Sequence, residues 1–450
     1  MFAEVRTFDQ EDSLLARLAA RRARVGVIGL GYVGLPLVRA VAHAGFEALG
    51  LDIDADKAAR LNAGRSYIRH IPDDAIGELL ATGRFEATTD FERITDLDVI
   101  AICVPTPLSR HRTPDLSFIE GTARAIAPHL QPGQLVVLES TTYPGTTAEV
   151  LKPILETSGL RSGQDLFLAY APEREDPGNA TFTTGRIPKV VGGEGAAAQE
   201  LACTFYRQFI GQVVPVSSTA TAEAVKLTEN IFRAVNIALV NELKVVFEAM
   251  AIDVFEVIDA AKTKPFGYMP FYPGPGLGGH CIPIDPFYLT WKAHEHEIPT
   301  RFIELAGEIN TAMPAHVVER LARALDARFA KGLNGARVLL IGLAYKKNVD
   351  DTRESPAFKI MDLLERRGAE VAFHDPHVAE IKPTREYRRY QGRRSTPLEP
   401  DALARFDAAL IVTDHDGIDW QALVDGVPLV VDTRNVTRGV TRDRERILIA

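Results

Sequence analysis

A glycine-rich turn between a short apolar run and an amphipathic stretch is the feature that most limits how this chain can fold. Residues 25–28 read as a strand that runs into Gly29-Leu-Gly-Tyr-Val-Gly34 and then into a helix with Pro36 in its first turn. A second apolar run ends at Asp52, ~20 residues after the turn. This order of elements predicts a βαβ unit that binds a dinucleotide.

The glycines of such a turn have separate roles. Gly29 permits the tight turn, Gly31 lets a pyrophosphate approach the backbone, and Gly34 brings helix and strand together. Asp52 would accept hydrogen bonds from ribose hydroxyls and repel a 2′-phosphate, so we expect NAD in preference to NADP, although Lys57 could tolerate the extra phosphate. The expected cofactor contacts here are Gly29, Gly31, Tyr32, Val33, Gly34, Asp52 and Lys57, with Thr106 and Thr141 after two later apolar runs.

The pattern along the chain predicts the fold class. Between residues 24 and 170, short runs that are apolar along their whole length alternate with amphipathic stretches, which indicates a parallel sheet covered by helices on both faces. From 218 to about 251 one helical pattern lacks glycine and proline. A second α/β unit begins at the strand-like run 337–342, after the boundary Lys331-Gly-Leu-Asn-Gly335. We therefore expect an α/β protein with two doubly wound, Rossmann-like domains joined by a long central helix.

The expected boundaries follow from these changes of pattern. They are an N-terminal extension at 1–22, a dinucleotide domain at 23–215, a central helical domain at 216–333 and a second α/β domain at 334–450. The apolar residues of the long helix return to one face, as a buried connecting helix requires: Val225, Ile231, Val235, Leu239, Leu243 and Val246.

Composition excludes several classes of function. The chain has 450 residues and a formal net charge of -9, which argues against nucleic acid or an anionic membrane as the main partner. Its cysteines, Cys103, Cys203 and Cys281, are odd in number, far apart and form no CxxC pair, so neither a disulfide framework nor a metal site is expected. The longest uncharged apolar run, 25–38, is short and glycine-rich, so we expect no membrane span and a cytoplasmic location.

Cys281 lies in a stretch, 271–288, that is dense in glycine and proline. It follows Gly278 and Gly279, while Asp285 and Pro286 resemble the N-cap and first residue of a helix. A thiol near a helix N-terminus ionises more easily, and the thiolate is the reactive form. For an arbitrary cysteine, inert packing is the commoner role, and the rest of the chain must decide.

Lys226 and Asn230 are four residues apart on the predicted long helix and so share a face. A cation and an amide donor can stabilise an oxyanion that develops where sulfur attacks carbon. The alternative is a solvated pair on the surface.

Four motifs in order resemble the UDP-glucose/GDP-mannose dehydrogenase family, from about Arg24 to the C-terminus. They are Gly29-Leu-Gly-Tyr-Val-Gly-Leu-Pro36, Lys226-Leu-Thr-Glu-Asn230, Gly274-Pro-Gly-Leu-Gly-Gly-His-Cys-Ile-Pro-Ile-Asp285 and Gly342-Leu-Ala-Tyr-Lys-Lys-Asn-Val-Asp-Asp-Thr-Arg353. The resemblance implies a four-electron oxidation of a sugar C6 alcohol to a carboxylate, with two NAD molecules reduced in succession.

The resemblance also implies residue roles. Cys281 matches the nucleophile that forms a thiohemiacetal and then a thioester, and Lys226 with Asn230 matches the oxyanion-stabilising pair. Asp285 matches the carboxylate that assists water or proton transfer, and Thr141 matches a threonine that orders active-site water.

The segment Ala171-Pro-Glu173-Arg174-Glu-Asp-Pro177 divides the family. The UDP-glucose branch has a second glutamate where this chain has Pro177, so acid/base work falls to Glu173, a water or Asp285. Together with His280 and Ile282 beside the thiol, this pattern is similar to the branch that acts on UDP-N-acetylhexosamines, with UDP-N-acetyl-D-glucosamine favoured, UDP-N-acetyl-D-mannosamine close and UDP-glucose a further alternative.

For the remaining contacts, the resemblance places Lys346 at the substrate and Arg353 at the NAD phosphates, and makes 334–450 the UDP-sugar-binding domain. Family members dimerise through the long helix, so a homodimer or higher homo-oligomer is expected. The full set of expected substrate contacts is Glu173, Arg174, Lys226, Asn230, Lys264, Phe266, Tyr272, Gly278 and Lys346, with a weaker case for Arg434.

Two other functions remain open at this level. A single-step dehydrogenase of the 3-hydroxyacid type shares the first domain and the helix lysine with asparagine, but it would not need Cys281 or the second α/β domain. A non-catalytic nucleotide-binding regulator could keep the fold, but the joint presence of Cys281, Lys226, Asn230 and Asp285 argues against it.

Overall fold

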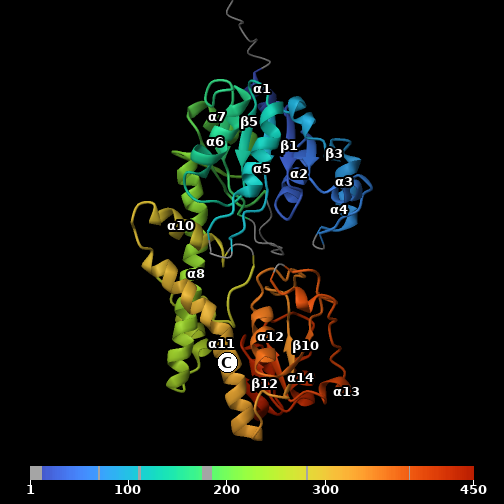
Figure 1. The fold of residues 1–450 in the computed structure, drawn as a ribbon, viewed down its shortest axis with the longest axis vertical. Helices are drawn as coiled ribbons and strands as arrows, with labels where there is room; N and C mark the ends of the chain where they lie inside the picture. Colours follow the sequence, from blue (N-terminus) through green and yellow to red (C-terminus); the bar gives the residue numbers. More distant parts are fainter. Residues whose placement is uncertain (1–12, 69–70, 110–112, 175–184, 280–281, 385) are drawn as a thin grey trace, which may run out of the picture. The chain divides into compact units, whose positions relative to one another are not determined.

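The computed structural model describes residues 13–68, 71–109, 113–174, 185–279, 282–384 and 386–450. The chain forms two compact units, Met1–Glu229 with Phe287–Ile298 and Asn230–Pro286 with Pro299–Ala450. Each unit contains one sheet flanked by helices (Figure 1). The helical middle predicted over 216–333 is divided between the two units, and the four predicted domain boundaries remain predictions.

Within the described residues, the first unit is built on an eight-stranded sheet in the order β3-β2-β1-β4-β5-β6-β7-β8, in which only the β6–β7 pair is antiparallel. Strands β4 and β5 are buried along their whole length, which is why their sequences are continuously apolar. The strands are β1 (Arg24–Ile28), β2 (Glu47–Leu51), β3 (Phe85–Thr88), β4 (Val99–Ile102), β5 (Leu135–Leu138), β6 (Phe167–Tyr170), β7 (Lys189–Gly193) and β8 (Val213–Val216).

The winding of this sheet reverses between β1 and β4, because β2 and β3 lie on one side of β1 and the later strands lie on the other. Ligands of such sheets bind at this reversal, outside the carboxyl ends of the strands. The helices of the unit are α1 (Leu14–Ala19), α2 (Gly34–His43), α3 (Ala55–Asn62), α4 (Asp73–Ala81), η2 (Phe91–Asp96), α5 (Ser117–Ile126), η3 (Ala127–His129), η4 (Thr147–Leu151), α6 (Lys152–Leu155), η5 (Glu156–Ser158) and α7 (Ala196–Tyr206).

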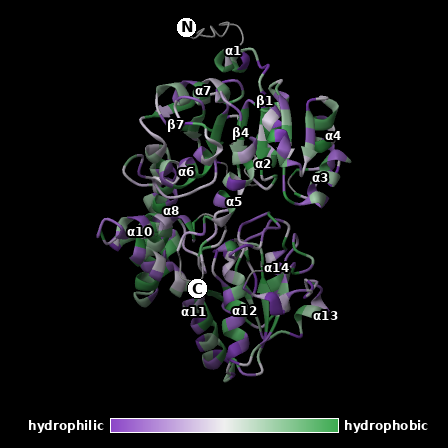
Figure 2. Cartoon of the chain, turned by 45° about the horizontal axis from the view of Figure 1, so that its top comes forward, coloured by the Kyte–Doolittle hydropathy of each residue, from purple (hydrophilic) through white to green (hydrophobic). Residues whose placement is uncertain are grey.

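The second unit has a parallel five-stranded sheet in the order β10-β9-β11-β12-β13. Its helices include α12, whose apolar residues Phe358 and Met361 are buried while its other side is hydrophilic (Figure 2). The elements are β9 (Arg337–Ile341), α12 (Pro356–Arg366), β10 (Glu370–His374), η6 (Arg388–Tyr390), α13 (Pro400–Leu403), β11 (Ala408–Ile411), α14 (Trp420–Gly426), β12 (Val430–Asp432), η7 (Val436–Gly439), η8 (Arg444–Arg446) and β13 (Ile447–Ile449).

The second sheet repeats the start of the first in detail. The amide of Gly29 donates to the carbonyl of Leu51 at 2.8 Å, and the amide of Gly342 donates to the carbonyl of His374 at 2.8 Å. An aspartate follows the neighbouring strand each time, Asp52 after β2 and Asp375 after β10, and Asp375 accepts from the backbone amides of Leu343 and Ala344 at 2.7 and 2.9 Å. The predicted fold class, two doubly wound Rossmann-like domains, is confirmed.

The remaining helices are α8 (Thr219–Ala249), α9 (Val254–Ala261), α10 (Asp285–His294) and α11 (Arg301–Phe329). Helix α8 confirms the predicted long central helix, but the prediction of its buried face was wrong. Leu239 and Val246 of the apolar stripe are 50% and 42% exposed, whereas Asn230, Asn241 and Lys244 are buried. Periodicity defines a face of a helix, but it cannot show whether the same chain covers that face.

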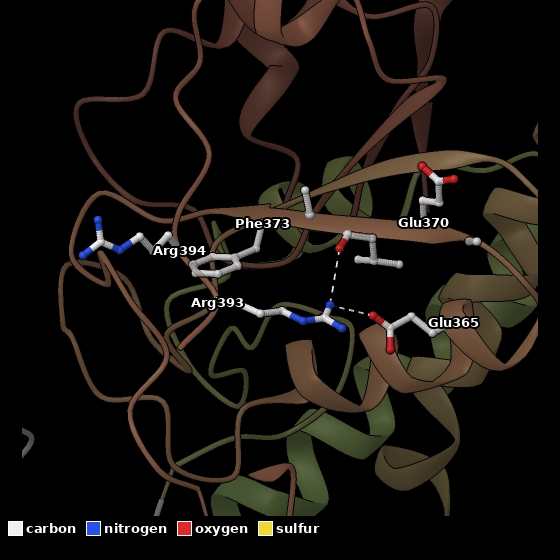
Figure 3. A pocket seen from close by; sticks show the side chains of 8 residues that line it. Glu365, Glu370, Phe373, Arg393 and Arg394 are labelled. Carbon is white, nitrogen blue, oxygen red and sulfur yellow. Dashed lines mark hydrogen bonds and ion pairs between the residues drawn. The ribbon is translucent and has the colours of Figure 1, made fainter. Parts of the chain in front are cut away.

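Strand β10 is an edge of the second sheet, and an open hollow of about 490 Å³ runs along it. Arg393 donates to Glu365 Oε1 at 2.6 Å and to the carbonyl of Val371 at 3.5 Å (Figure 3), and the amide of Thr396 donates to the carbonyl of Phe373 at 2.7 Å. A charged side chain and a loop therefore cover backbone groups that would otherwise invite pairing with another strand. This hollow lies beside a strand and not at the strand ends.

Candidate active site

The glycine turn after β1 leaves a specific space. Gly29 has φ +91°, and a Cβ atom there would lie 2.6 Å from the carbonyl oxygen of Cys103. A Cβ atom at Gly34 would lie 2.0 Å from the carbonyl oxygen of Gly29, whereas one at Gly31 would have no neighbour within 4 Å. Gly29 and Gly34 therefore serve the turn and its packing, and Gly31 leaves an open cradle of the kind that a pyrophosphate fills.

Asp52 lies at the end of β2 and is 6% exposed. Its Oδ2 accepts from the amide of Leu30 at 2.9 Å and from Lys57 Nζ at 3.1 Å, and its Oδ1 accepts from the amide of Asp54 at 3.0 Å. Lys57, the cation that could tolerate a 2′-phosphate, is therefore paired with Asp52 itself. This arrangement fits the ribose of a dinucleotide better than a ribose with a 2′-phosphate.

The loops after β4 and β5 lie at the same edge of the sheet. Thr106 is buried, and its carbonyl accepts from the hydroxyl of Tyr288 at 2.7 Å. Ser140 Oγ donates to the carbonyl of Val104 at 2.7 Å, which joins the two loops, and Thr141 beside it is half-buried. The predicted cofactor contacts Thr106 and Thr141 are thus on adjacent strand ends.

The loop after β6 carries Glu173 and Arg174. The guanidinium of Arg174 donates to both carboxylate oxygens of Glu229 on α8, at 2.5 and 3.2 Å, and to the carbonyl of Pro188 at 2.5 Å. Arg174, expected at the substrate, is therefore engaged with protein groups. Glu173 contacts Lys189, a residue that the motifs did not single out.

The buried side of α8 carries the predicted helix pair. Lys226 is 8% exposed, and its ammonium has no hydrogen-bond or ion-pair partner within the described residues. One turn later, Asn230 Nδ2 donates to Asp285 Oδ2 at 2.6 Å, and both side chains are buried. The alternative of a solvated surface pair is wrong for Asn230. A buried amide and carboxylate that fix each other's orientation are suited to position reacting groups.

Cys281 and His280 lie outside the described residues, as does Pro177, so their predicted roles stay predictions. The two glycines before them are described. Gly279 has φ +88°, its amide donates to the carbonyl of Arg353 at 3.2 Å, and a Cβ atom at Gly278 or Gly279 would lie within 3 Å of Tyr345. These glycines therefore leave room for Tyr345 of the same unit.

Two residues predicted at the substrate, Tyr272 and Arg434, line a cavity of about 570 Å³ in the second unit. Lys347 also lines this cavity. Tyr272 donates to Asp259 Oδ1 at 2.7 Å, Lys347 pairs with Asp416 at 2.7 Å, and Arg434 Nε donates to the carbonyl of Val412 at 2.8 Å.

The other predicted contacts of this unit are dispersed. Lys346 is half-buried, Phe266 is 71% exposed, and Lys264 Nζ lies 5.2 Å from the Phe266 ring. Arg353, expected at the NAD phosphates, pairs with Asp351 at 2.6 Å.

Comparison with protein families decides the identity of the chain. Models of the NAD binding domain, the central domain and the UDP binding domain of one family match residues 23–210, 220–312 and 339–439. The chain belongs to the UDP-glucose/GDP-mannose dehydrogenase family. It is an NAD-dependent UDP-sugar dehydrogenase, so the predicted cofactor and the predicted class of enzyme are confirmed.

Individual relatives of this dehydrogenase differ in the sugar that their names specify. A UDP-N-acetyl-D-mannosamine dehydrogenase of Pyrococcus horikoshii is 34% identical, with 92% of this chain and 96% of the relative covered. A UDP-N-acetyl-D-glucosamine 6-dehydrogenase of Pseudomonas aeruginosa is 36% identical, with 87% and 90% covered. A solved structure of the UDP-D-ManNAc dehydrogenase from Pyrococcus horikoshii superposes with a TM-score of 0.83 at 35% identity, covering 92% of this chain and 95% of that one.

Three residues of the dehydrogenase's first unit were missed by sequence reasoning: Glu139, Lys189 and Tyr206, which form one buried cluster with Glu173. The available signal was a charged residue at the end of an apolar strand run, as for Glu139 after β5 and Lys189 at the start of β7. Within the described residues, no group of side chains could hold a metal ion, and no helix is long and apolar enough to cross a membrane.

Proposed function

We propose that this dehydrogenase oxidises C6 of UDP-N-acetyl-D-glucosamine to the carboxylate, giving UDP-N-acetyl-D-glucosaminuronate in the cytoplasm for surface polysaccharide. The observation that best supports an active site of this family is the buried hydrogen bond between Asn230 and Asp285. The choice of sugar is supported by Pro177 in place of a glutamate, by His280 and Ile282 beside the thiol, and by the 36% identity to a UDP-N-acetyl-D-glucosamine enzyme. UDP-N-acetyl-D-mannosamine is the second candidate, supported by the structural similarity to the Pyrococcus horikoshii enzyme.

The open cradle at Gly31 and the carboxylate of Asp52 would hold NAD, with Gly29, Tyr32, Val33, Gly34, Thr106 and Thr141 around it. When bound, NAD accepts a hydride, and two NAD molecules in succession take the four electrons. The chain's own residues must then hold the sugar between the two oxidation steps.

In this proposal, the Cys281 sulfur bonds to the aldehyde carbon after the first oxidation, and the resulting thiohemiacetal becomes a thioester in the second. The ammonium of Lys226 and the amide of Asn230 stabilise the oxyanion on that carbon. Asp285 fixes the Asn230 amide through their 2.6 Å hydrogen bond. A water molecule then bonds to the thioester carbon, the C–S bond breaks, and the carboxylate product leaves.

The nucleotide half would bind in the second unit, at the 570 Å³ cavity that Arg434 and Tyr272 line. A UDP diphosphate is anionic, and the net charge of the chain is -9, so local cations are required there. Lys346, Lys347 and Arg434 are the candidates within this unit, and the match to a UDP binding domain over 339–439 supports the choice.

A homodimer through α8 would cover the exposed apolar stripe of this helix, the long green helix of Figure 1. Phe232, Leu239 and Val246 of this helix are between 42% and 50% exposed, and Met250 just after it is 62% exposed. Exposed apolar surface of this kind marks protein interfaces. The loop after α9 carries the exposed Phe266 beside Lys264, which the proposal places at the substrate of the neighbouring subunit.

The deciding experiment incubates purified protein with NAD and separately with UDP-N-acetyl-D-glucosamine, UDP-N-acetyl-D-mannosamine, UDP-N-acetyl-D-galactosamine or UDP-glucose, and counts NADH formed per sugar consumed. A ratio of about two supports the thioester route, because each NAD takes one hydride. A ratio of about one indicates a single-step dehydrogenase, and no turnover with any sugar favours a regulator. Cys281→Ser should abolish the complete cycle while leaving NAD binding intact.

A further inference from the structure

A buried lysine links two carboxylates at the edge of the first sheet where the cofactor loops end. Lys189 Nζ lies 2.6 Å from Glu139 Oε2 and 3.2 Å from Glu173 Oε2. The side chains of Lys189, Glu139 and Glu173 are 6%, 0% and 14% exposed. Of the three, Glu173 is therefore the most exposed to solvent.

The topology explains how a lysine reaches this edge. The β6–β7 pair is the antiparallel pair of the described sheet, with Ala169 opposite Gly193 and Tyr170 opposite Gly192. Continuing that register beyond β6 by three residues brings Glu173 opposite Lys189. A parallel β7 would have placed its first residue at the other edge of the sheet, away from the strand carboxyl ends.

The surroundings hold Lys189 in one place. Glu139, which follows β5, accepts from Lys189 on one carboxylate oxygen and from the hydroxyl of Tyr206 at 2.5 Å on the other. The Lys189 ammonium also lies 5.3 Å from the centre of the Tyr206 ring. Burial alone lowers the pKa of Lys189, but the two carboxylates outweigh it and raise the pKa above its ordinary value, so the ammonium stays charged.

Glu173 is fixed through both carboxylate oxygens. Its Oε1 accepts from the amide of Arg174 at 2.6 Å, while its Oε2 faces Lys189. Arg174 in turn is tied to Glu229 and to the carbonyl of Pro188, the residue before Lys189. The loop that carries Glu173 is thus joined to the start of β7 by two charged interactions and to α8 by the Arg174–Glu229 pair, a strong constraint for a side chain at a strand end.

We propose that Lys189 is a positioning residue that orients Glu173 and keeps it ionised as the base for thioester hydrolysis, with Glu139 and Tyr206 anchoring Lys189. The proposal rests on the proposed function, in which Pro177 leaves Glu173 as a candidate for acid/base work. As water bonds to the thioester carbon, one of its protons passes to Glu173, the C–S bond breaks, and sulfur leaves as a thiolate. The proton on Glu173 returns to solvent or to the thiolate.

The charged and titratable groups that face Glu173 define the expected pH effect. They are Lys189 from β7, Glu139 after β5, Tyr206 from α7, Cys103 after β4, and Arg174 with its partner Glu229 from α8. Burial, and after it the charge of Glu139, raises the pKa of Cys103 well above its ordinary value, and burial does the same for Tyr206, so both stay neutral. Among the groups named, Lys189 is the cation that contacts the Glu173 side chain directly.

The test compares Lys189→Met, Lys189→Arg and Glu173→Gln in the full-length protein. Because Lys189→Met leaves two carboxylates facing each other without a cation, the double variant Glu139→Gln/Lys189→Met, which removes both charges of the buried pair, is measured beside it. Lys152→Met is the matched control, since it removes a lysine of the same unit that pairs with Glu194, outside the cluster.

Three readouts separate positioning from a merely structural role. We expect the double variant to bind NAD normally and to lose about 10- to 100-fold in kcat with little change in KM, less than the ~10²–10⁴-fold that a general base contributes. The acid limb of the pH–rate profile should move up by about 1–3 pH units in Lys189→Met, because a carboxylate without its cation is easier to protonate, and by less in the double variant, where loss of the Glu139 charge offsets part of the shift. Intact-protein mass spectrometry should show a sugar acyl group on the enzyme, and Lys189→Arg should restore most of the rate.

The outcomes distinguish this proposal from the proposed function. If Glu173→Gln stalls as an acyl-enzyme but the double variant keeps the wild-type kcat and pH profile, Lys189 does not position Glu173. If Glu173→Gln itself hydrolyses the thioester at the wild-type rate, the base assignment on which the proposal rests is wrong. If the wild-type protein turns over no UDP-sugar, the proposed function fails first.

Discussion

Two alanine variants of the glycine turn separate stability from cofactor binding. The methyl group added in Gly34→Ala should lower the stability of the protein, and the one added in Gly31→Ala should lower its affinity for NAD. In Gly34→Ala the added carbon would lie 2.0 Å from the carbonyl oxygen of Gly29 and 3.2 Å from Val27 Cγ1. The nearer atom is backbone and cannot rotate away, so the cost should be at the upper end of overpacking, about 3 kcal/mol. Alanine regains up to about 1 kcal/mol of helix propensity at the start of α2, which leaves a net loss of about 2 kcal/mol.

The matched variant is Gly31→Ala, where an added carbon has no neighbour within 4 Å. We expect its melting temperature to equal that of the wild type and its NAD affinity to fall about tenfold or more, because the methyl fills the space of the pyrophosphate. For Gly34→Ala, a loss of about 2 kcal/mol corresponds to a midpoint lower by roughly 4–8 °C, at roughly 2–4 °C per kcal/mol for a unit of this size.

Calorimetry without ligand and titration of NAD by isothermal calorimetry measure the two effects separately. Serine in place of Gly31 provides a further control, because a side chain of similar size should cause a similar loss of affinity. The reasoning is refuted if Gly31→Ala lowers the melting temperature while Gly34→Ala does not, or if Gly31→Ala binds NAD as tightly as the wild type.

Three further predictions concern cofactor choice, acid stability and assembly. Asp52→Asn should weaken NAD binding about tenfold and reduce the preference for NAD over NADP, because it frees Lys57 for a 2′-phosphate. The ratio of kcat/KM for NAD to that for NADP measures the preference, and an unchanged ratio contradicts the prediction. Burial alone raises the pKa of Asp375, but hydrogen bonding from His415 and from backbone amides outweighs it and lowers the pKa to about 2. This carboxylate therefore contributes about 2 kcal/mol to the free energy of unfolding above pH ~4, and that contribution is lost as the pH falls to ~2. Asp375→Asn should flatten that part of the acid unfolding curve. Leu239→Asp should convert a dimer into monomers in light scattering; a wild-type monomer, or a variant of unchanged mass, removes the case for an α8 interface.

Particular residues show where sequence reasoning succeeded. The turn at 29–34 and the acidic residue at 52 were predicted because each requirement is local: a positive φ at Gly29, a close approach at Gly34 and an acceptor after a strand. The second α/β unit was predicted from a strand after a glycine boundary, and the structure adds that its loop and Asp375 repeat the contacts of the first.

What the sequence did not predict also has physical reasons. The apolar stripe of α8 was assigned to the interior, yet Leu239 is half-exposed, because hydrophobic spacing does not say which chain covers a face. Arg174 remains a predicted substrate contact, but its pairing with Glu229 was not predicted, because no sequence spacing links residues 55 positions apart. The close approach of Gly278 and Gly279 to Tyr345 was likewise not predicted, because these residues lie more than sixty positions apart in the sequence.

The sequence by itself determined the order of strands and helices, the dinucleotide turn and the family, since these depend on local periodicity and on backbone conformations that few residues permit. Only the tertiary structure decided which charged groups meet at the edge of the first sheet. The antiparallel register of β7 against β6 brings Lys189 opposite Glu173, and neighbouring strands bring Glu139 beside them. Strand order and register arise from long-range packing, so no local pattern in the chain encodes that meeting.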